Sequence, residues 1–287
     1  MKNKNRPRTV YHYCGADAFL NIITHGRLWV SDARKTNDRQ ELHRFKALAL
    51  GHLKNHSKRD NQRNAIIADL DLHFELIQDI SDYYICCFSE EPDSVPQWAA
   101  YAERGTGFSI GFDVNALRKA VDAPLVDSSY SIVPGEAGSG PWGLGPVFYA
   151  EENTQNEQLD HLMMLIDIEP SFGLDASKVA REYIDRVCAF CKHPDFRTEH
   201  EWRIVHNVTL SRERAKELVD VSPDINWRKS IYGLTPYLET PSLKECIREV
   251  IIGPSNADNG AENYIRQFLD DSGIKNAKVT VSQSPYR

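Results

Sequence analysis

The sequence predicts a mixed α+β or α/β protein, most simply a single domain over residues 1–287 with helical insertions. Short segments rich in Val, Ile, Tyr, Phe and Trp, which are typical of strands, alternate along the chain with segments of helical apolar periodicity. The composition, 41% hydrophobic and 26% charged, is that of a globular protein, and no apolar run approaches the ~20 residues of a membrane span. Interleaved strands and helices without an internal repeat fit one layered core.

The expected elements follow from β-forming runs, helical periodicity and the Gly or Pro residues that bound them. Predicted strands cover residues 8–13, 27–30, 83–88, 107–113, 147–150, 198–205, 249–254 and 277–282, with paired strands within 226–238. Predicted helices cover residues 15–25, 38–55, 64–79, 95–104, 153–169, 175–191 and 258–269. The helices within 39–80 are predicted to form an inserted helical hairpin. Residues 134–146 are rich in Gly and Pro, so we expect a mobile turn or flap there and no helix or central strand.

Charge and cysteine content indicate the expected surroundings of the protein. Residues 1–8 lack the apolar segment of a signal peptide, and the six cysteines are scattered, so we expect a cytoplasmic protein with reduced thiols. Residues 1–63 carry 14 Lys and Arg and 5 Asp and Glu, a net charge of +9, which leaves −16 for the remainder. Such a segment could bind a polyanion or pair with the acidic remainder of the protein, and both possibilities stay open.

The strongest candidates for catalysis lie in the predicted strand 198–205. In an extended strand Glu199, Glu201 and Arg203 share one face, while the residues between them point toward a core. Two carboxylates on one rigid edge are suited to charge stabilisation and proton transfer. The alternative is an edge strand whose solvated charges form ordinary surface ion pairs.

Other residues carry weaker signals. Trp98 and Tyr101 lie at i, i+3 on one helix face, where they form either core or a platform for a planar ligand. Cys188 and Cys191 with His193 resemble half of a zinc site, but no second ligand pair follows at a suitable spacing, so no metal is expected.

Several spaced segments together resemble a broad bacterial family of proteins of unknown function. They are residues 11–13, 26–29, 31–34 with 37, 38 and 41, 87–89 with 98 and 101, 193–196 with 199–203, 251–254 and 284–287. This resemblance extends over nearly the whole chain and implies no particular reaction.

A second resemblance, to the ADP-ribosyltransferases, implies a chemistry. A strand bearing His12, followed by a helix and Gly26, resembles the first motif of those enzymes. Ser89 or Tyr101 then stands where a central strand carries Ser or an aromatic residue, and residues 199–201 stand where a late strand carries E-x-E. The resemblance implies an ADP-ribosyltransferase-like split β-sheet core and the use of NAD.

Roles for the catalytic candidates follow from that resemblance. Glu201 would hydrogen-bond the ribose 2′-OH and stabilise the oxocarbenium-like charge that forms when nicotinamide leaves. Glu199 would orient or deprotonate the acceptor, with Arg203 as the nearest charge.

The same resemblance assigns residues to NAD binding. His12 would hold the adenosine-side ribose, and Tyr101 or Trp98 would stack on a ring of NAD. Tyr13 and Ser89 belong to the predicted site as well. Arg34, in the polar loop after the second strand, is the candidate for the pyrophosphate because guanidinium matches phosphate oxygens bidentately.

The expected partners are NAD, an acceptor and a neutralising protein. The basic segment favours a nucleic acid, RNA before DNA, over a protein as acceptor. Because a free enzyme of this type would harm its host, we expect a toxin or anti-phage effector held by an antitoxin or chaperone, with no membrane partner. The alternatives are an NAD glycohydrolase or other nucleotide-processing enzyme, and a non-enzymatic interaction module.

Overall fold

The computed structural model describes residues 7–35, 41–56, 61–76, 83–130, 141–151, 156–168, 175–208, 224–230, 233–256, 258 and 260–286. Its strands are β1 (Thr9–Cys14), β2 (Trp29–Asp32), β3 (Tyr83–Ser89), β4 (Phe108–Asp113), β5 (Trp142–Pro146), β6 (Phe148–Tyr149), β7 (Cys191–Lys192), β8 (Glu201–Asn207), β9 (Asn226–Ser230), β10 (Gly233–Glu239), β11 (Ile247–Ile252) and β12 (Lys278–Val281). Its helices are α1 (Ala16–His25), α2 (Glu41–His56), α3 (Asn61–Leu76), α4 (Val95–Tyr101), α5 (Val114–Ala120), α6 (Glu157–Ile168), α7 (Ala176–Val187) and α9 (Ala261–Asp271). No helix in these ranges is long and apolar enough to cross a membrane.

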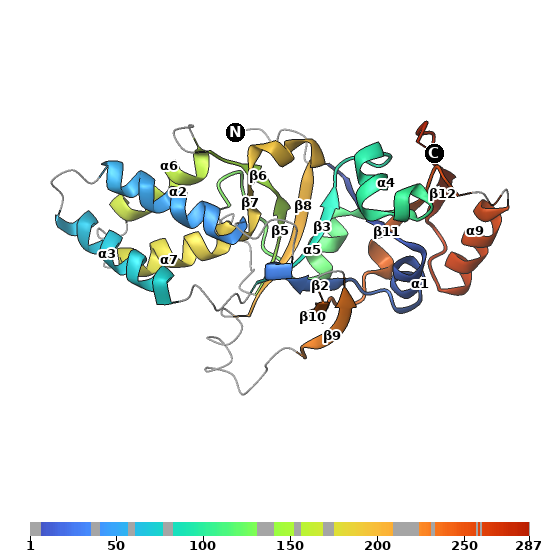
Figure 1. The fold of residues 1–287 in the computed structure, drawn as a ribbon. Coiled ribbons are helices and arrows are strands. Elements are labelled where there is room, and N and C mark those ends of the chain that lie inside the picture. Colours follow the sequence, from blue (N-terminus) through green and yellow to red (C-terminus); the bar gives the residue numbers. More distant parts are fainter. Residues whose placement is uncertain are drawn as a thin grey trace.

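The fold is a mixed α+β structure built on a ten-stranded sheet, with β6 and β7 forming a second, two-stranded sheet. The main sheet has the order β12-β11-β4-β1-β3-β2-β10-β9, and β8 and β5 extend it from β3. Its strand pairs are antiparallel except β11 with β12, which is parallel. Helices α2, α3, α6 and α7 gather at one end of the elongated molecule, and α1, α4 and α9 lie toward the other (Figure 1).

Strand β3 joins the two halves of the sheet because three strands pair with it. On one side, β8 pairs with β3 along its full length. On the other side, β2 pairs with Tyr84 and Ile85, and β1 pairs with Ser89. Residues 86–88 of β3 lie between these two contacts and have no strand partner on that side within the described chain. The sheet therefore divides in its middle, and a cavity opens there.

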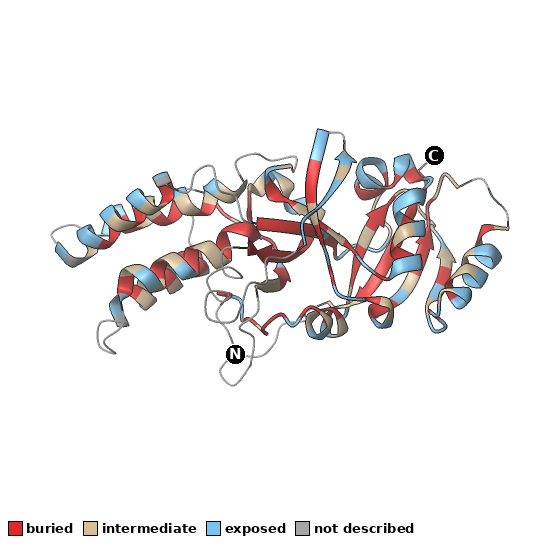
Figure 2. Ribbon diagram, turned by 90° about the horizontal axis from the view of Figure 1, so that it is seen from below, coloured by how far each residue is buried: buried red, intermediate tan, exposed pale blue. Residues whose placement is uncertain are grey.

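Apolar side chains cover both faces of the sheet, so buried residues follow the central strands and the inner sides of the helices (Figure 2). One core packs α1, α5 and α9 on the sheet and includes Trp202 and Ile204 of β8. A second core packs α2, α3, α6 and α7 and includes Val205. Because its alternate residues enter different cores, β8 is buried along its whole length.

Most of the predicted elements are confirmed with small shifts of their ends. The predicted helix 15–25 is α1, and it ends at Gly26, whose φ of 68° gives the left-handed C-cap typical of glycine. The paired strands within 226–238 are β9 and β10. The hairpin predicted over 39–80 corresponds to α2 and α3, which contact each other and also pack on α6 and α7. That this hairpin is an insertion into a single domain stays a prediction.

The prediction of an irregular turn over 134–146 is wrong for Trp142–Pro146, which form β5 and pair with β8. Gly145 helps to make this pairing possible, because a β-carbon there would lie 3.1 Å from the ring of Tyr130. A glycine pattern that is typical of a turn therefore also fits a strand lying against aromatic rings. Residues 131–140 lie outside the described ranges.

The predicted helix 175–191 ends early, at Val187. A 3₁₀ turn follows at Cys188–Phe190, and the next two residues form β7, which pairs with β6. The carbonyl of Ala189 accepts a hydrogen bond from Nη1 of Arg203 at 2.6 Å. This contact with β8 replaces a helical partner for that carbonyl.

The predicted strand 198–205 begins only at Glu201. Residues Pro194–Glu199 form a 3₁₀ turn, and His200 adopts a left-handed conformation with φ 44° that interrupts the backbone direction. Glu199 therefore lies on the turn before β8 and not on the strand with Glu201.

Two glycine substitutions test this packing. A β-carbon at Gly253, just after β11, would lie 2.2 Å from the carbonyl oxygen of Gly105, and backbone atoms cannot move aside. We expect Gly253→Ala to lower the free energy of unfolding by about 1–3 kcal/mol.

Gly51 in α2 has no atom within 4 Å of its β-carbon position, so Gly51→Ala should raise the free energy of unfolding by about 1 kcal/mol. Chemical denaturation measures both, and shifts of the same sign would contradict the packing.

Candidate active site

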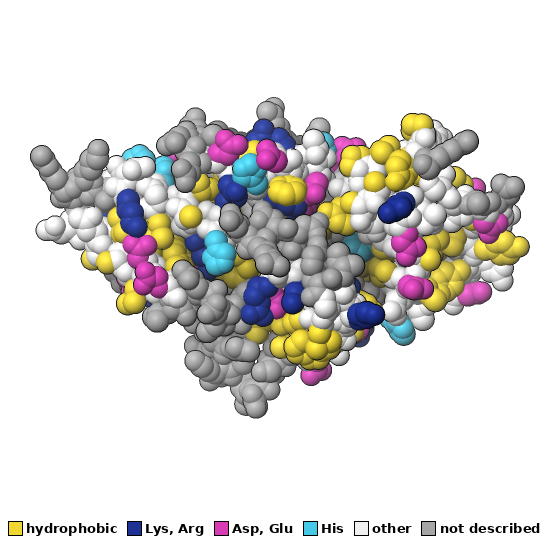
Figure 3. Space-filling model, viewed as in Figure 1, with side chains coloured by type: hydrophobic (Ala, Val, Ile, Leu, Met, Phe, Trp, Pro, Cys, Tyr) yellow, Lys and Arg dark blue, Asp and Glu magenta, His cyan; other side chains and the backbone are white. Residues whose placement is uncertain are grey.

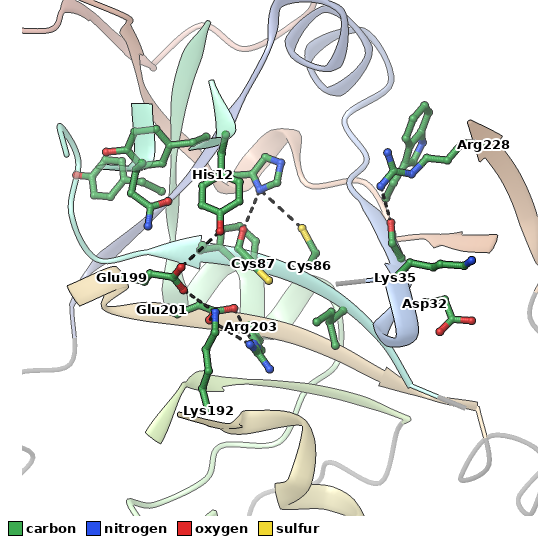
Figure 4. A pocket seen from close by; sticks show the side chains of 18 residues that line it. His12, Asp32, Lys35, Cys86, Cys87, Lys192, Glu199, Glu201, Arg203 and Arg228 are labelled. Atoms are coloured by element: carbon green, nitrogen blue, oxygen red, sulfur yellow. Dashed lines mark hydrogen bonds and ion pairs between the residues drawn. The ribbon is translucent and has the colours of Figure 1, made fainter. Parts of the chain in front are cut away.

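A cavity of about 280 Å³ opens where the sheet divides at β3. Its walls come from β1, β2, β3, α4, β7, β8 and β9 and from the turns before α2 and β8, so segments far apart in the sequence meet here (Figure 4). Six of the predicted site residues line it: His12, Tyr13, Tyr101, Glu199, Glu201 and Arg203. A concave site with a few converging polar groups is the usual place for binding and catalysis.

Glu201 and Arg203 form a buried, bidentate ion pair on one face of β8. Nε of Arg203 donates to Oε1 of Glu201 at 2.7 Å, and Nη2 donates to Oε2 at 3.1 Å. Burial raises the pKa of Glu201, but the charge and hydrogen bonds of Arg203, together with the charge of Lys192, outweigh burial and hold the pKa at about 2. The Glu201 and Arg203 side chains are 5% and 1% exposed, so the alternative of a solvated surface pair is wrong.

Lys192 connects the two carboxylates and was not among the predicted site residues. Its Nζ donates to Oε2 of Glu199 at 2.6 Å and to Oε2 of Glu201 at 2.9 Å. The two acceptor oxygens therefore lie within about 5.5 Å of each other, the sum of these distances.

Glu199 lies at the rim of the cavity. Its side chain is 21% exposed, compared with 5% for Glu201. Its Oε1 lies 3.5 Å from the hydroxyl of Tyr101, which comes from α4. Glu199 is therefore the carboxylate that is more accessible from solvent, whereas Glu201 lies deeper.

His12 lies between the carboxylates and the opposite wall of the cavity. Nδ1 of His12 lies 2.9 Å from the carbonyl oxygen of Cys87, on the part of β3 whose edge facing β1 and β2 has no strand partner in the described chain. Burial lowers the pKa of His12, the bond to Cys87 opposes this, and the nearby charge of Arg228 lowers the pKa further. In the neutral ring Nδ1 carries the proton for the carbonyl, so Nε2 is an acceptor suited to a hydroxyl group.

The wall opposite the carboxylates is basic. Lys35, from the 3₁₀ turn after β2, and Arg228, from β9, line this end together with Trp29 and Ser31. In Figure 4 His12 lies between Lys35 and Arg228 on one side and the group of Glu199, Glu201, Lys192 and Arg203 on the other. One end of the cavity therefore holds carboxylates paired with cations, and the other end holds Lys35 and Arg228 together with Asp32, which is paired with Arg34.

Lys192, Lys35 and Arg228 are site residues that sequence reasoning missed. Lys192 directly precedes a helix-breaking His-Pro pair, a position that carries no signal for binding. Arg228 lies in a short alternating run, where it shares no face with its neighbours Trp227 and Lys229. That alternation predicts that the Arg228 side chain lies on the opposite face of the strand from Trp227 and Lys229. It does not predict which part of the protein Arg228 contacts.

Trp98 does not line the cavity. It is fully buried, its ring lies edge-on to Tyr13 at 4.8 Å, and its Nε1 donates to Asp93 at 2.6 Å. The open choice between core and ligand platform is thus decided for core at Trp98, which leaves Tyr101 as the aromatic residue of α4 at the site.

Arg34 and Ser89 also lie outside the cavity lining. Nε of Arg34 donates to Oδ1 of Asp32 at 3.0 Å, so its guanidinium pairs with a residue of β2. Ser89 is buried, and its hydroxyl donates to the carbonyl of Glu199 at 2.8 Å. Ser89 therefore positions the turn that carries Glu199, and the structure does not support direct ligand contact by either residue.

All six cysteines are free, and all except Cys87 are buried. Cys87 lines the cavity together with Glu201. Within the described ranges no group of three or more His, Cys, Asp or Glu side chains could hold a metal ion.

Several described cations of the basic N-terminal segment pair with the protein's own carboxylates. Lys46 lies 3.4 Å from Asp185 of α7, and Arg63 lies 2.6 Å from Asp167 of α6. Lys54 pairs within the hairpin with Asp71. On the face shown in Figure 3, Lys and Arg side chains over the helical end lie beside Asp and Glu side chains. These cations of the segment thus form internal ion pairs, and whether the segment also binds a polyanion stays open, because residues 1–6, 36–40 and 57–60 lie outside the described ranges.

Residues 97–204 match the family described as Protein of unknown function (DUF2971). This match runs from α4 to β8 and confirms, over that part of the chain, the predicted resemblance to a family of unknown function. It includes Tyr101, Lys192, Glu199, Glu201 and Arg203. No curated protein and no solved structure matches the chain.

Substitution of Lys192 tests the charge network. Lys192→Met would leave Glu199 and Glu201 close together with only Arg203 to compensate them, so we expect a loss of about 3 kcal/mol in the free energy of unfolding. The double variant Lys192→Met/Glu199→Gln should recover part of this loss, because removing both partners costs less than orphaning one. Denaturant titration measures these differences.

Lys178→Met is the matched control for that experiment, because Lys178 forms an exposed i,i+4 pair with Glu182. Such a pair contributes only about 0.3–0.5 kcal/mol. If Lys192→Met were no more destabilising than Lys178→Met, the proposed network would not hold the site together.

The depressed pKa of Glu201 predicts a pH dependence of stability. The ionised carboxylate stabilises the folded state fully above its unfolded pKa of 4.5, and this stabilisation disappears as pH falls toward the folded pKa of about 2. The stability advantage of the natural chain over Glu201→Gln should therefore shrink by on the order of 3 kcal/mol over this interval. Denaturant titrations across this range, with Glu262→Gln at an exposed pair as control, would contradict the assignment if the advantage stayed constant.

Proposed function

We propose that this chain is an NAD-dependent ADP-ribosyltransferase. The observation that carries the proposal is the meeting of His12 from β1 and Glu201 from β8 in one cavity where the sheet divides. Tyr101 from α4 stands on the same wall as Glu199. The order His, aromatic residue, E-x-E along the chain is the order that the resemblance to ADP-ribosyltransferases implies, and a divided sheet agrees with the split core of that class.

Glu201 supplies electrostatic stabilisation in this proposal. Its carboxylate is ionised, fixed by Arg203 and Lys192, and enclosed by protein, so it needs no reorganisation during the reaction. It accepts a hydrogen bond from the ribose 2′-OH and stabilises the positive charge that develops at the ribose as nicotinamide leaves. Preorganised groups of this kind contribute roughly 10²- to 10³-fold in rate.

Glu199 acts on the acceptor in this proposal. The bond between ribose C1′ and the nicotinamide nitrogen breaks, and its electron pair leaves with nicotinamide. An acceptor oxygen or nitrogen forms the new bond to C1′, and its proton passes to Glu199. The greater exposure of Glu199 and its position beside Tyr101 support this division of roles between the two carboxylates.

His12 and Tyr101 position the substrate. The acceptor nitrogen Nε2 of neutral His12 binds a ribose hydroxyl, and the ring of Tyr101 packs on the nicotinamide ring near the carboxylates. Tyr13 supports this wall, because its hydroxyl is held by the carbonyl of Glu91 at 2.7 Å and the amide of Ser94 at 2.9 Å.

The acceptor class and the biological role extend the proposal. We propose RNA as the first acceptor to test, with DNA and protein as the other outcomes, although Lys46, Lys54 and Arg63 of the basic segment pair with the protein's own carboxylates. An enzyme that consumes NAD and modifies a cellular macromolecule harms its host. A toxin or anti-phage effector neutralised by an antitoxin or chaperone therefore fits this chemistry.

Labelled NAD tests the proposal directly. The purified chain is incubated with NAD labelled in its ADP-ribose part and with separate pools of cellular RNA, DNA and protein. We expect label in one pool and release of nicotinamide, and we expect Glu201→Gln to reduce both by roughly 10²- to 10³-fold. Label released as free ADP-ribose without transfer would indicate an NAD glycohydrolase instead.

Tyr101→Ala keeps this test informative if Glu201→Gln fails to fold. Tyr101 is 41% exposed, so its removal should cost little stability while reducing nicotinamide release at least about tenfold. Glu262→Gln serves as a surface control. Absence of both transfer and nicotinamide release in the folded natural chain, tested free of any neutralising partner, would exclude the NAD assignment and favour a non-enzymatic interaction module.

A further inference from the structure

A second cavity adjoins the candidate active site. It has a volume of about 140 Å³ and is lined mainly by α1 and the segment that leads from it into β2, including Asn21, His25 and Arg27. Three residues line both cavities: His12, Trp29 and Arg228. The two cavities are therefore adjacent, and these three side chains lie between them.

Arg228 is held in a fixed orientation at this junction. Its Nη2 donates to Oγ of Ser31 at 2.9 Å, and its guanidinium lies 5.7 Å from the centre of the Trp29 ring. Trp29 is itself held against Tyr237 of β10, with ring centres 4.7 Å apart. Nε of Arg228 is buried and has no hydrogen-bond partner among the described residues. The guanidinium of Arg228 is thus held in place, while its Nε can still donate a hydrogen bond.

The charges around both cavities point to an anion at Arg228. Each carboxylate that lines them has a cationic partner: Glu201 with Arg203, Glu199 with Lys192, Asp32 with Arg34 and Glu239 with Arg27. Arg228 forms no ion pair with any carboxylate in the described part of the chain. A half-buried guanidinium without a counter-charge favours binding of an anion, and its planar fork matches phosphate oxygens.

We propose that Arg228 and the hydroxyl of Ser31 form an anion subsite that binds the diphosphate of a dinucleotide, with one nucleoside half in each cavity. Ser31 contributes because its oxygen accepts from Arg228 and its own hydrogen is available to donate to a phosphate oxygen. Lys35 adds an ammonium group to the same wall. The subsite deepens the proposed function, on which its assignment to NAD rests, and it replaces the predicted role of Arg34.

Isothermal titration calorimetry of the full chain with ADP-ribose, ADP and adenosine tests the subsite without requiring catalysis. We expect ADP and ADP-ribose to bind at least about tenfold more tightly than adenosine. Arg228→Met, which keeps the aliphatic packing, should remove most of this difference and leave adenosine binding within about twofold. Arg228→Lys should be intermediate because an ammonium lacks the planar fork.

Lys229→Met is the matched control, because Lys229 is the next residue of β9, is exposed and lies on the opposite face. The subsite is overturned if the natural chain binds ADP no more tightly than adenosine. It is also overturned if folded Arg228→Met, or Arg228→Lys should the former not fold, keeps the full preference for ADP.

The same variants separate failure of the subsite from failure of the proposed function. Nicotinamide release with an unchanged KM for NAD in Arg228→Met would overturn the subsite and leave the transferase proposal standing. Tight ADP binding that depends on Arg228, in a chain that neither releases nicotinamide nor transfers label, would support the subsite and overturn the transferase proposal.

Discussion

The buried ion pair between Glu201 and Arg203 is the interaction on which the site depends. A guanidinium as enclosed as that of Arg203 must be compensated by nearby oxygens, and it takes them from Glu201 and from the carbonyl of Ala189. The second of these bonds ties β8 to the turn after α7, which leads directly into β7. The residue that fixes the carboxylate therefore also places Lys192, which binds that carboxylate from the other side.

The pairing of β3 explains why a cavity exists in the middle of a sheet. A continuous sheet satisfies its backbone groups with neighbouring strands, but β1 and β2 contact β3 at different places and leave one edge of residues 86–88 open. His12 contacts the exposed carbonyl of Cys87. One hydrogen bond thus satisfies the carbonyl of Cys87 and also orients the ring of His12. This bond also fixes which nitrogen of His12 can accept from a ligand.

Charge is distributed differently at the two ends of the molecule. At the helical end, cations such as Lys46 and Arg63 form ion pairs with carboxylates of neighbouring helices. These ion pairs hold the helices together. At the divided sheet, carboxylates are paired on one wall, and Arg228 remains without a carboxylate on the other. Arg228 comes from the edge hairpin of β9 and β10. Residues from the first strand and from a late hairpin of the chain therefore line the same cavity. An anionic ligand in this cavity therefore finds its uncompensated cation at Arg228.

The sequence by itself determined the class of fold, most of the helices and strands, and the presence of Glu199, Glu201, Arg203, His12 and Tyr101 as site candidates. These follow from local periodicity, which depends on side chains a few residues apart. The sequence did not predict β5. Gly145 leaves room for the ring of Tyr130, but in the sequence such a glycine cannot be distinguished from a glycine in a turn.

Only the tertiary structure decided which of the polar and aromatic candidates reach the cavity. Trp98 and Tyr101 share a helix face in the sequence pattern, yet Trp98 is buried against Tyr13, whereas Tyr101 lies at the rim of the cavity beside Glu199. Arg34 is taken by Asp32, while Arg228, nearly two hundred residues later, enters the site from an edge strand. Whether a charge binds a ligand or a neighbouring side chain depends on which groups the fold brings within a few ångströms, and local sequence does not contain those distances.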